Sequence, residues 1–199
     1  SGASVLTDPH QPPPPGVAPL AVTVSNEHET HNQVHFFPRS RVLRAFEPGG
    51  TYREVSTRVG DIQVKSIPGS AFRGGEETFI SNVIFLFKVG NLCIAHLGNL
   101  RRPLSAEQLR ALGKVHVLMV PIDGSWNLPL AEIPALIRKV NPNVVLPMHY
   151  WDRGRAEDFL AVLDGRFPVR KSPRDTLTLS RSTLSAQPTV VILSYRSSN

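Results

Sequence analysis

The sequence contains a single cysteine, Cys93, among its 199 residues. One cysteine cannot form an internal disulfide, and it cannot build a thiolate metal site alone. Cys93 lies in the apolar run 92–95, which predicts a buried and unreactive thiol. A disulfide-stapled scaffold is therefore excluded, and a chain of this length can instead bury a sizeable core.

Long hydrophobic runs are also missing. No apolar stretch reaches the roughly 18 residues that a membrane-spanning helix requires. Residues 1–9 lack both the basic region and the apolar stretch of a secretory leader. We therefore expect no membrane segment and a cytoplasmic location.

Charge is modest and not segregated. Charged residues make up 19% of the chain, hydrophobic residues 41%, and the net charge is +6. These values are ordinary for a globular protein and argue against disorder. The arginines are scattered, and no dense basic run with interleaved aromatic residues occurs, so nucleic acid is not the expected partner. The same positive balance could attract a small anionic ligand.

The order of periodic segments predicts one α/β domain over residues 1–199. The first half is mostly strands, and the second half alternates strands with helices, which is typical of a layered sandwich of two sheets with outer helices. Helices are expected at about 105–113, 130–140 and 155–163. The expected strands are 3–6, 20–24, 41–46, 51–55, 61–67, 81–88, 92–96, 115–120, 144–147, 176–180 and 189–195.

Local signals fix some of these boundaries. Ser105 and Gln108 are spaced as a capping box, and Gly113 supplies a helix stop. Pro134 is compatible with the second helix only in its first turn. The proline run 12–15 predicts an extended surface loop.

Three polar loops follow the ends of apolar strands, at 25–32, 96–99 and 148–150. Sheet proteins place ligand sites at such positions. His28 and His31 are three residues apart in the first loop, so one turn could direct both imidazoles to one centre. With His149 they form a candidate metal-ligand set, since neutral imidazole is a good zinc ligand. A chance surface pair and a structural histidine remain the alternatives.

These segments, in this order, resemble the metallo-β-lactamase superfamily, in particular its ascorbate-6-phosphate lactonase-like branch of metal-dependent hydrolases. The resemblance covers about residues 5–150 and implies an αββα sandwich of two mixed β-sheets with outer helices. The first strand of the family, with its Gly-His pair, is not present in this sequence. The most specific stretches are Val-Thr-Val-Ser at 22–25, His-Leu-Gly-Asn at 96–99 and Leu-Pro-Met-His-Tyr at 146–150.

The resemblance implies a site for two metal ions, usually zinc or manganese. The family reads His-x-His-x-Asp-His in the first loop, and here Asn26 and Thr30 replace the first histidine and the aspartate. Ala71 stands where a further histidine is expected, and Asn99 where an aspartate bridges the metals. The ligands that remain are His28, His31 and His149. Loss of the bridging charge leaves the repulsion between two dications without compensation.

Several functions are compatible with this pattern. The first is a degenerate hydrolase-fold protein, with no metal or one weakly bound zinc or manganese ion, that is kept for binding or assembly, including self-association as a homo-oligomer. The second is an active hydrolase of lactones, amides or phosphoesters that uses a rearranged mononuclear site, with a carboxylate from Asp8, Glu27 or Glu29. A nucleic-acid-binding relative is a third. Trp126 and Trp151 are expected either to line the cleft or to pack in the core.

Overall fold

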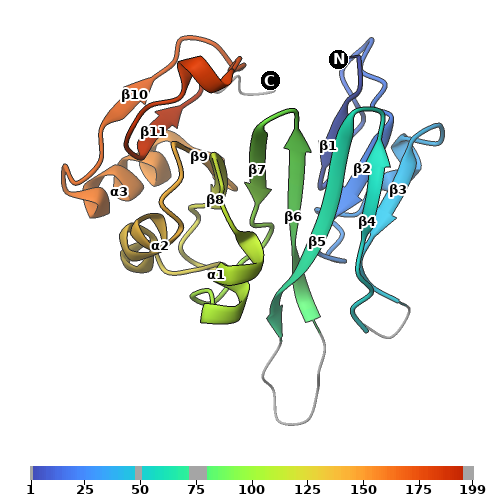
Figure 1. Cartoon of the computed structure of the whole chain (residues 1–199), viewed down its shortest axis with the longest axis horizontal. Helices are drawn as coiled ribbons and strands as arrows, with labels where there is room; N and C mark the ends of the chain where they lie inside the picture. Colours follow the sequence, from blue (N-terminus) through green and yellow to red (C-terminus); the bar gives the residue numbers. More distant parts are fainter. Residues whose placement is uncertain (1, 48–50, 72–79, 195–199) are drawn as a thin grey trace. The chain divides into compact units, whose positions relative to one another are not determined.

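The computed structural model describes residues 2–47, 51–71 and 80–194. The chain divides into two compact units (Figure 1). The first comprises residues 1–90 and 96–100, and the second comprises residues 91–95 and 101–199. The single domain expected from the sequence stays a prediction.

A small parallel sheet opens the first unit. Its strands are β1 (Val5–Thr7), β2 (Ala21–Val24) and β3 (Arg41–Arg44), in the order β1-β2-β3. Every residue of β2 is buried, as its apolar and β-branched run predicts. A 3-10 turn, η1 (Val34–Phe36), lies between β2 and β3 in the sequence. The carboxyl end of β2 leads directly into the first polar loop.

An antiparallel ladder completes the first unit. Strand β4 (Ser56–Val59) pairs with β5 (Ile62–Ala71), and β5 pairs with β6 (Ile80–Val89). Figure 1 shows β5 and β6 as a long ribbon. Val64, Val83 and Phe85 are buried in the core. The register shifts after Pro68, which fits the inability of proline to donate to a ladder.

The second unit alternates strands and helices. Strand β7 (Leu92–His96) contributes residues 92–95 to this unit. Strands β8, β9, β11 and β10 pair in parallel, in that order. A parallel pair needs a crossover, and the chain supplies one through α2 between β8 and β9. The elements are α1 (Ala106–Leu112), β8 (Val117–Pro121), η2 (Leu130–Glu132), α2 (Ile133–Val140), β9 (Val144–Met148), α3 (Arg153–Leu163), β10 (Val169–Lys171), η3 (Arg181–Thr183) and β11 (Thr189–Ile192).

Apolar side chains cover the inner faces of these helices. Ile133, Leu136 and Ile137 of α2 are buried, and so are Phe159 and Leu163 of α3. Helices α2 and α3 lie side by side (Figure 1). Among the described residues, no helix has the length and apolar character needed to cross a bilayer.

The predicted helix signals are confirmed. Ser105 accepts from the Gln108 amide, the Gln108 side chain accepts in return from the Ser105 amide, and Gly113 follows with a φ of +59°. Pro134 lies in the first turn of α2. The segment expected as one helix from residue 130 begins instead as the 3-10 turn η2.

Two expected strands are wrong. Residues 51–55 form only an isolated bridge between Tyr52 and Phe46, because this segment is exposed or half-exposed and β4 begins later. Residues 176–180 have no strand partner, and the pairing partner of β11 is β10, whose three residues are all exposed and give no apolar signal. Cys93 is only partly buried, which corrects the expectation of a buried thiol. Tyr195, the last residue of the strand expected at 189–195, lies outside the described residues.

The capping box of α1 gives a direct test of these local rules. Ser105→Ala should lower the free energy of unfolding by about 1 kcal/mol, because it removes the side-chain acceptor for an otherwise unsatisfied helix amide. Denaturant titration of the variant measures this change. Ser56→Ala is a matched control, because Ser56 is exposed at the start of β4, and an equal loss there would contradict the assignment.

Candidate functional site

Asp8 fixes the start of the histidine loop. Its Oδ1 accepts a hydrogen bond from the Ser25 amide at 2.7 Å, and its Oδ2 accepts one from Ser25 Oγ at 2.5 Å. Asp8 has a φ of +48°, which is uncommon for a residue other than glycine. Both carboxylate oxygens of Asp8 are therefore occupied in holding the loop at the end of β2.

Asn26 uses its side chain to shape the same loop. Its Oδ1 accepts from the His28 amide at 2.8 Å, which is an Asx-turn contact. The oxygen that would have to replace an imidazole ligand is thus already bonded to the backbone. Asn26 is buried, whereas the side chain of His28 is exposed.

Thr30 lies between the two histidines of the loop. Its Oγ1 is 2.9 Å from His28 Nδ1 and 2.7 Å from His31 Nδ1. The two rings are edge-on with centroids 6.2 Å apart, and His31 is buried. One turn thus holds the two rings near each other with both Nδ1 atoms facing a neutral hydroxyl, and their role as metal ligands stays a prediction.

Asn82 of β6 positions the second polar loop. Its Oδ1 accepts from the Asn99 amide at 2.7 Å, and its Nδ2 donates to the Leu97 carbonyl at 2.9 Å. Gly98 lies between them with a φ of +55°, and a Cβ there would be 2.5 Å from Ser25 Oγ. Only glycine allows this approach, so the second loop lies directly against the first.

Asn99 occupies the position where the family resemblance implies a bridging aspartate. Its side chain is buried, and among the described residues its Oδ1 has no hydrogen-bond partner. A buried acceptor without a partner is costly. The oxygen is neutral, so it cannot supply the negative charge that a carboxylate would place between two cations.

In the second unit, His149 pairs with a carboxylate that the sequence analysis missed. His149 Nδ1 lies 3.4 Å from Asp123 Oδ1, which is long for a hydrogen bond. Asp123 is buried and accepts from Asn127 Nδ2 at 2.7 Å and from the Trp126 amide at 2.7 Å. His149 has a φ of +58°, the second such departure at a candidate site residue.

Hydrogen bonding holds Asp123 in its charged form. Burial raises the pKa of this carboxyl, but the contact with His149 and the hydrogen bonds from the Trp126 amide, Asn127 and the Ser125 amide together outweigh it, so the pKa lies well below its usual range. The signal was available in the sequence, because an aspartate followed by Gly-Ser after a buried strand is typical of an Asx turn.

Several other candidate residues lie apart from these contacts. Glu27 is exposed and forms an ion pair with Arg44, and Glu29 is exposed. Trp126 and Trp151 are 72% and 58% exposed, so the expectation of core packing is wrong for both. The ring centroid of Trp151 lies 6.1 Å from that of His149.

The donors present do not fit a pair of metal ions. The oxygens of Asn26 and Thr30 are engaged within the loop, and that of Asn99 is neutral. Across residues 2–47, 51–71 and 80–194 there is no cluster of three His, Cys, Asp or Glu side chains suited to a metal ion. Ala71 ends β5, and its side chain lies outside the described set.

The family model of the beta-lactamase superfamily domain matches residues 1–149 of the 199 in the chain. The fold and this match together define a metallo-β-lactamase fold of the α/β class. The chain therefore belongs to the metallo-β-lactamase superfamily.

Two curated relatives carry the name UPF0173. A UPF0173 metal-dependent hydrolase from Carboxydothermus hydrogenoformans is 29% identical over 106 residues, which cover 51% of this chain and 45% of that protein. A UPF0173 protein from Pyrococcus furiosus is 30% identical over 125 residues, which cover 60% of this chain and 56% of that protein. The chain thus spans about half the length of the curated relatives it matches.

Solved structures agree on the fold. A protein from Thermotoga maritima, assigned to the Zn-dependent hydrolases of the metallo-β-lactamase superfamily, is 23% identical with a TM-score of 0.67, covering 96% of this chain and 90% of that one. A protein from Parabacteroides distasonis assigned to the metal-dependent hydrolases is 13% identical with a TM-score of 0.60, covering 82% and 81%. The chain is thus similar to metal-dependent hydrolases in fold.

The buried carboxylate of Asp123 makes a testable contribution to stability. Asp123→Asn should lower the free energy of unfolding by about 2 kcal/mol at pH 7, because donors aimed at a carboxylate lose a charged acceptor. The folded pKa is depressed, so this contribution is complete above the unfolded pKa of about 3.9 and is lost as the pH falls below it.

Urea titrations of both proteins in chelator, from pH 7 down to pH 3, measure the difference between them. That difference should shrink below about pH 4. Asp158→Asn is the control, since Asp158 is 64% exposed and its contact with Arg155 is 3.6 Å long. A difference that is constant with pH would contradict the role assigned to the Asp123 charge.

Proposed function

We propose that this protein is a degenerate relative of the ascorbate-6-phosphate lactonase-like hydrolases, with little or no hydrolytic activity, retained for binding or assembly. The observation that carries the proposal is the Thr30 hydroxyl between the Nδ1 atoms of His28 and His31. Family resemblance places an aspartate at that position.

The hydrogen bonds of Thr30 constrain the tautomers of both rings. The Thr30 amide lies 3.4 Å from His28 Nδ1 and can only donate to it. His28 Nδ1 is then an acceptor, so its ring proton is on Nε2, and the Thr30 hydroxyl donates to the same atom. Thr30 Oγ1 accepts in turn from His31 Nδ1, which places the His31 lone pair on Nε2. In this arrangement only one imidazole of the pair presents a lone pair away from Thr30.

Charge supports the same conclusion. Two metal ions in such sites are typically about 3.5–4 Å apart and need an anion to offset their repulsion. In the loops of the first unit, the Asp8 carboxylate is bonded to Ser25, that of Glu27 is paired with Arg44, and Glu29 is exposed. Asn99 and Thr30 add no charge. A dinuclear centre would therefore be weak.

A mononuclear hydrolase is the second candidate, and the Asp123–His149 pair favours it. Metal-ligating histidines commonly direct their second ring nitrogen at a carboxylate, which fixes the tautomer and raises the basicity of the ligand. With its Nδ1 toward Asp123, His149 has that arrangement. One zinc or manganese ion with His149 among its ligands would then be the cofactor.

Restoring the family ligands tests the proposal. A variant combining Asn26→His, Thr30→Asp, Ala71→His and Asn99→Asp should bind zinc at least about 100-fold more tightly than the parent, since changing even a partner of a ligand costs 10–100-fold. Calorimetric titration of chelator-stripped protein gives both affinities. Asn91→Asp, which adds charge at an exposed turn, is the control.

Two outcomes would contradict the proposal. Unchanged zinc affinity in the fourfold variant would mean that these positions are not the ligand positions. Tight zinc binding by the parent that His149→Ala abolishes would favour the mononuclear hydrolase instead.

A further inference from the structure

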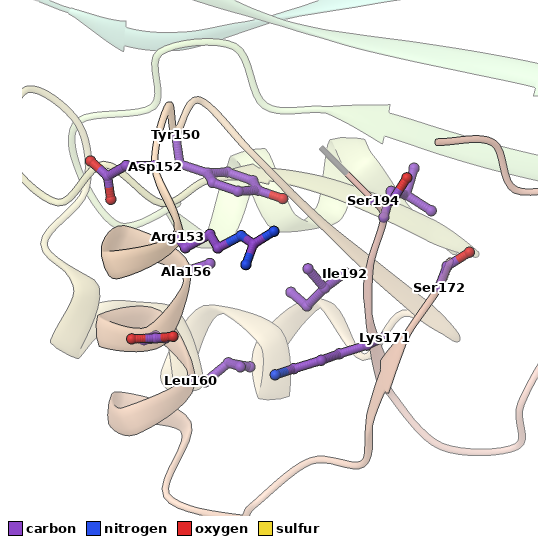
Figure 2. A pocket seen from close by; sticks show the side chains of 11 residues that line it. Tyr150, Asp152, Arg153, Ala156, Leu160, Lys171, Ser172, Ile192 and Ser194 are labelled. Carbon is purple, nitrogen blue, oxygen red and sulfur yellow. The ribbon is translucent and has the colours of Figure 1, made fainter. Parts of the chain in front are cut away.

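A cavity of about 340 Å³ lies in the second unit, between α3, β10 and the residues that end β11 (Figure 2). Its size falls within the range of sites for small molecules. None of its lining residues belongs to the candidate metal ligands, and all of them lie between Tyr150 and Ser194. The cavity can therefore be considered without reference to the metal content of the protein.

Two cationic side chains enter this cavity. Figure 2 shows the guanidinium of Arg153 in its centre and the side chain of Lys171 crossing it from β10. Neither side chain forms an ion pair with another described residue. By contrast, Arg155 on the same helix lies 3.6 Å from Asp158, and Arg166 lies 3.3 Å from Asp164. The charges of Arg153 and Lys171 are thus not neutralised by an ion pair with a described residue.

The acidic residues of the lining do not cancel these charges by contact. Asp152 accepts from the Arg155 amide at 2.7 Å as the N-cap of α3, and Figure 2 shows its carboxylate turned away from Arg153. Glu157 is exposed. A neighbouring cavity of about 380 Å³ shares Lys171 and Ser172, adds Arg170 and Arg174, and has no acidic residue in its lining. The potential around β10 is therefore positive.

The rest of the lining combines neutral donors with an apolar floor. Tyr150 presents its hydroxyl into the cavity (Figure 2), where it can donate a hydrogen bond. Ser172 and Ser194 add two more hydroxyls. Leu160 and Ile192 add apolar side chains to the same lining. This composition suits a ligand with an anionic head and a compact apolar body.

We infer that this cavity binds a small organic anion, with the charged head between Arg153 and Lys171 and an apolar body resting on Leu160 and Ile192. The planar fork of an arginine matches the oxygens of a carboxylate or a phosphate, and lysine adds a point charge. The apolar surface distinguishes such a ligand from an inorganic anion, which would gain nothing from it.

Titration of the ¹⁵N-labelled full chain in chelator, followed by amide chemical shifts, tests the inference. Benzoate and phenyl phosphate are the probes, and they separate a carboxylate head from a phosphate head. Two controls accompany the probes. Benzyl alcohol has the apolar ring without the anionic head, and inorganic phosphate has the anionic charge without an apolar ring. Saturable shifts confined to the start of α3 and to residues 171–172 are expected with at least one charged probe and with neither control.

Variants decide whether the two cations carry the binding. Arg153→Gln and Lys171→Gln should each lower the affinity for the bound probe by about 10-fold or more, because each removes a charged hydrogen-bonding partner. Arg155→Gln is the matched control on the same helix and should leave the affinity unchanged. The inference is overturned by the absence of saturable shifts, by equal binding of benzyl alcohol or inorganic phosphate, or by an equal loss in Arg155→Gln.

Discussion

The loops of the first unit depend on one buried amide, the side chain of Asn82. It binds the backbone on both sides of Gly98, and Gly98 in turn lies against Ser25. The backbone of the next residue, Val83, donates to the Ser25 carbonyl at 2.8 Å. Strand β6 therefore positions both polar loops at once, and Asp8 also fixes the first of them. Thr30 and Asn99, where the resemblance implies charged residues, are neutral.

Two side chains at the candidate ligand positions are similar in size to those that the resemblance implies, but they differ in charge. Thr30 and Asn99 are close in size to the aspartates that the resemblance implies, so the loops keep a compact form without the anions. The neutral groups then find local partners or, for Asn99 Oδ1, none among the described residues. Positive φ values at Asp8 and His149 are departures of the kind that cluster at functional sites. On the proposal of a degenerate site, these loops keep the scaffold of a metal site with much of its charge removed.

The sequence was most informative where one physical signal dominated. Strand β2 is a fully buried, β-branched run, β9 is an apolar run buried at its first two residues, and α1 carries both a capping box and a glycine stop. Strand β10 could not be predicted, because its three exposed residues show no hydrophobic periodicity. Its pairing with β11 depends on tertiary structure, which a local sequence pattern does not encode.

The candidate site was predicted only in part, for related reasons. Spacing suggested that His28 and His31 share a turn, but the bridging role of Thr30 depends on side-chain rotamers that spacing does not encode. Asp123 was missed because a lone aspartate after a strand is common. Its importance comes from the convergence of His149, Asn127 and two amides on it. The cavity beside α3 requires β10 and β11 to be in place, so no local pattern indicates it.

The central claim is that the charge needed to hold two metal ions has been lost from loops that keep their shape. Elemental analysis of the full chain, purified without chelator from cells supplied with zinc and manganese, tests it most directly. The account predicts well under one tightly held metal ion per chain. Two equivalents of zinc or manganese per chain that survive extensive dialysis would contradict it.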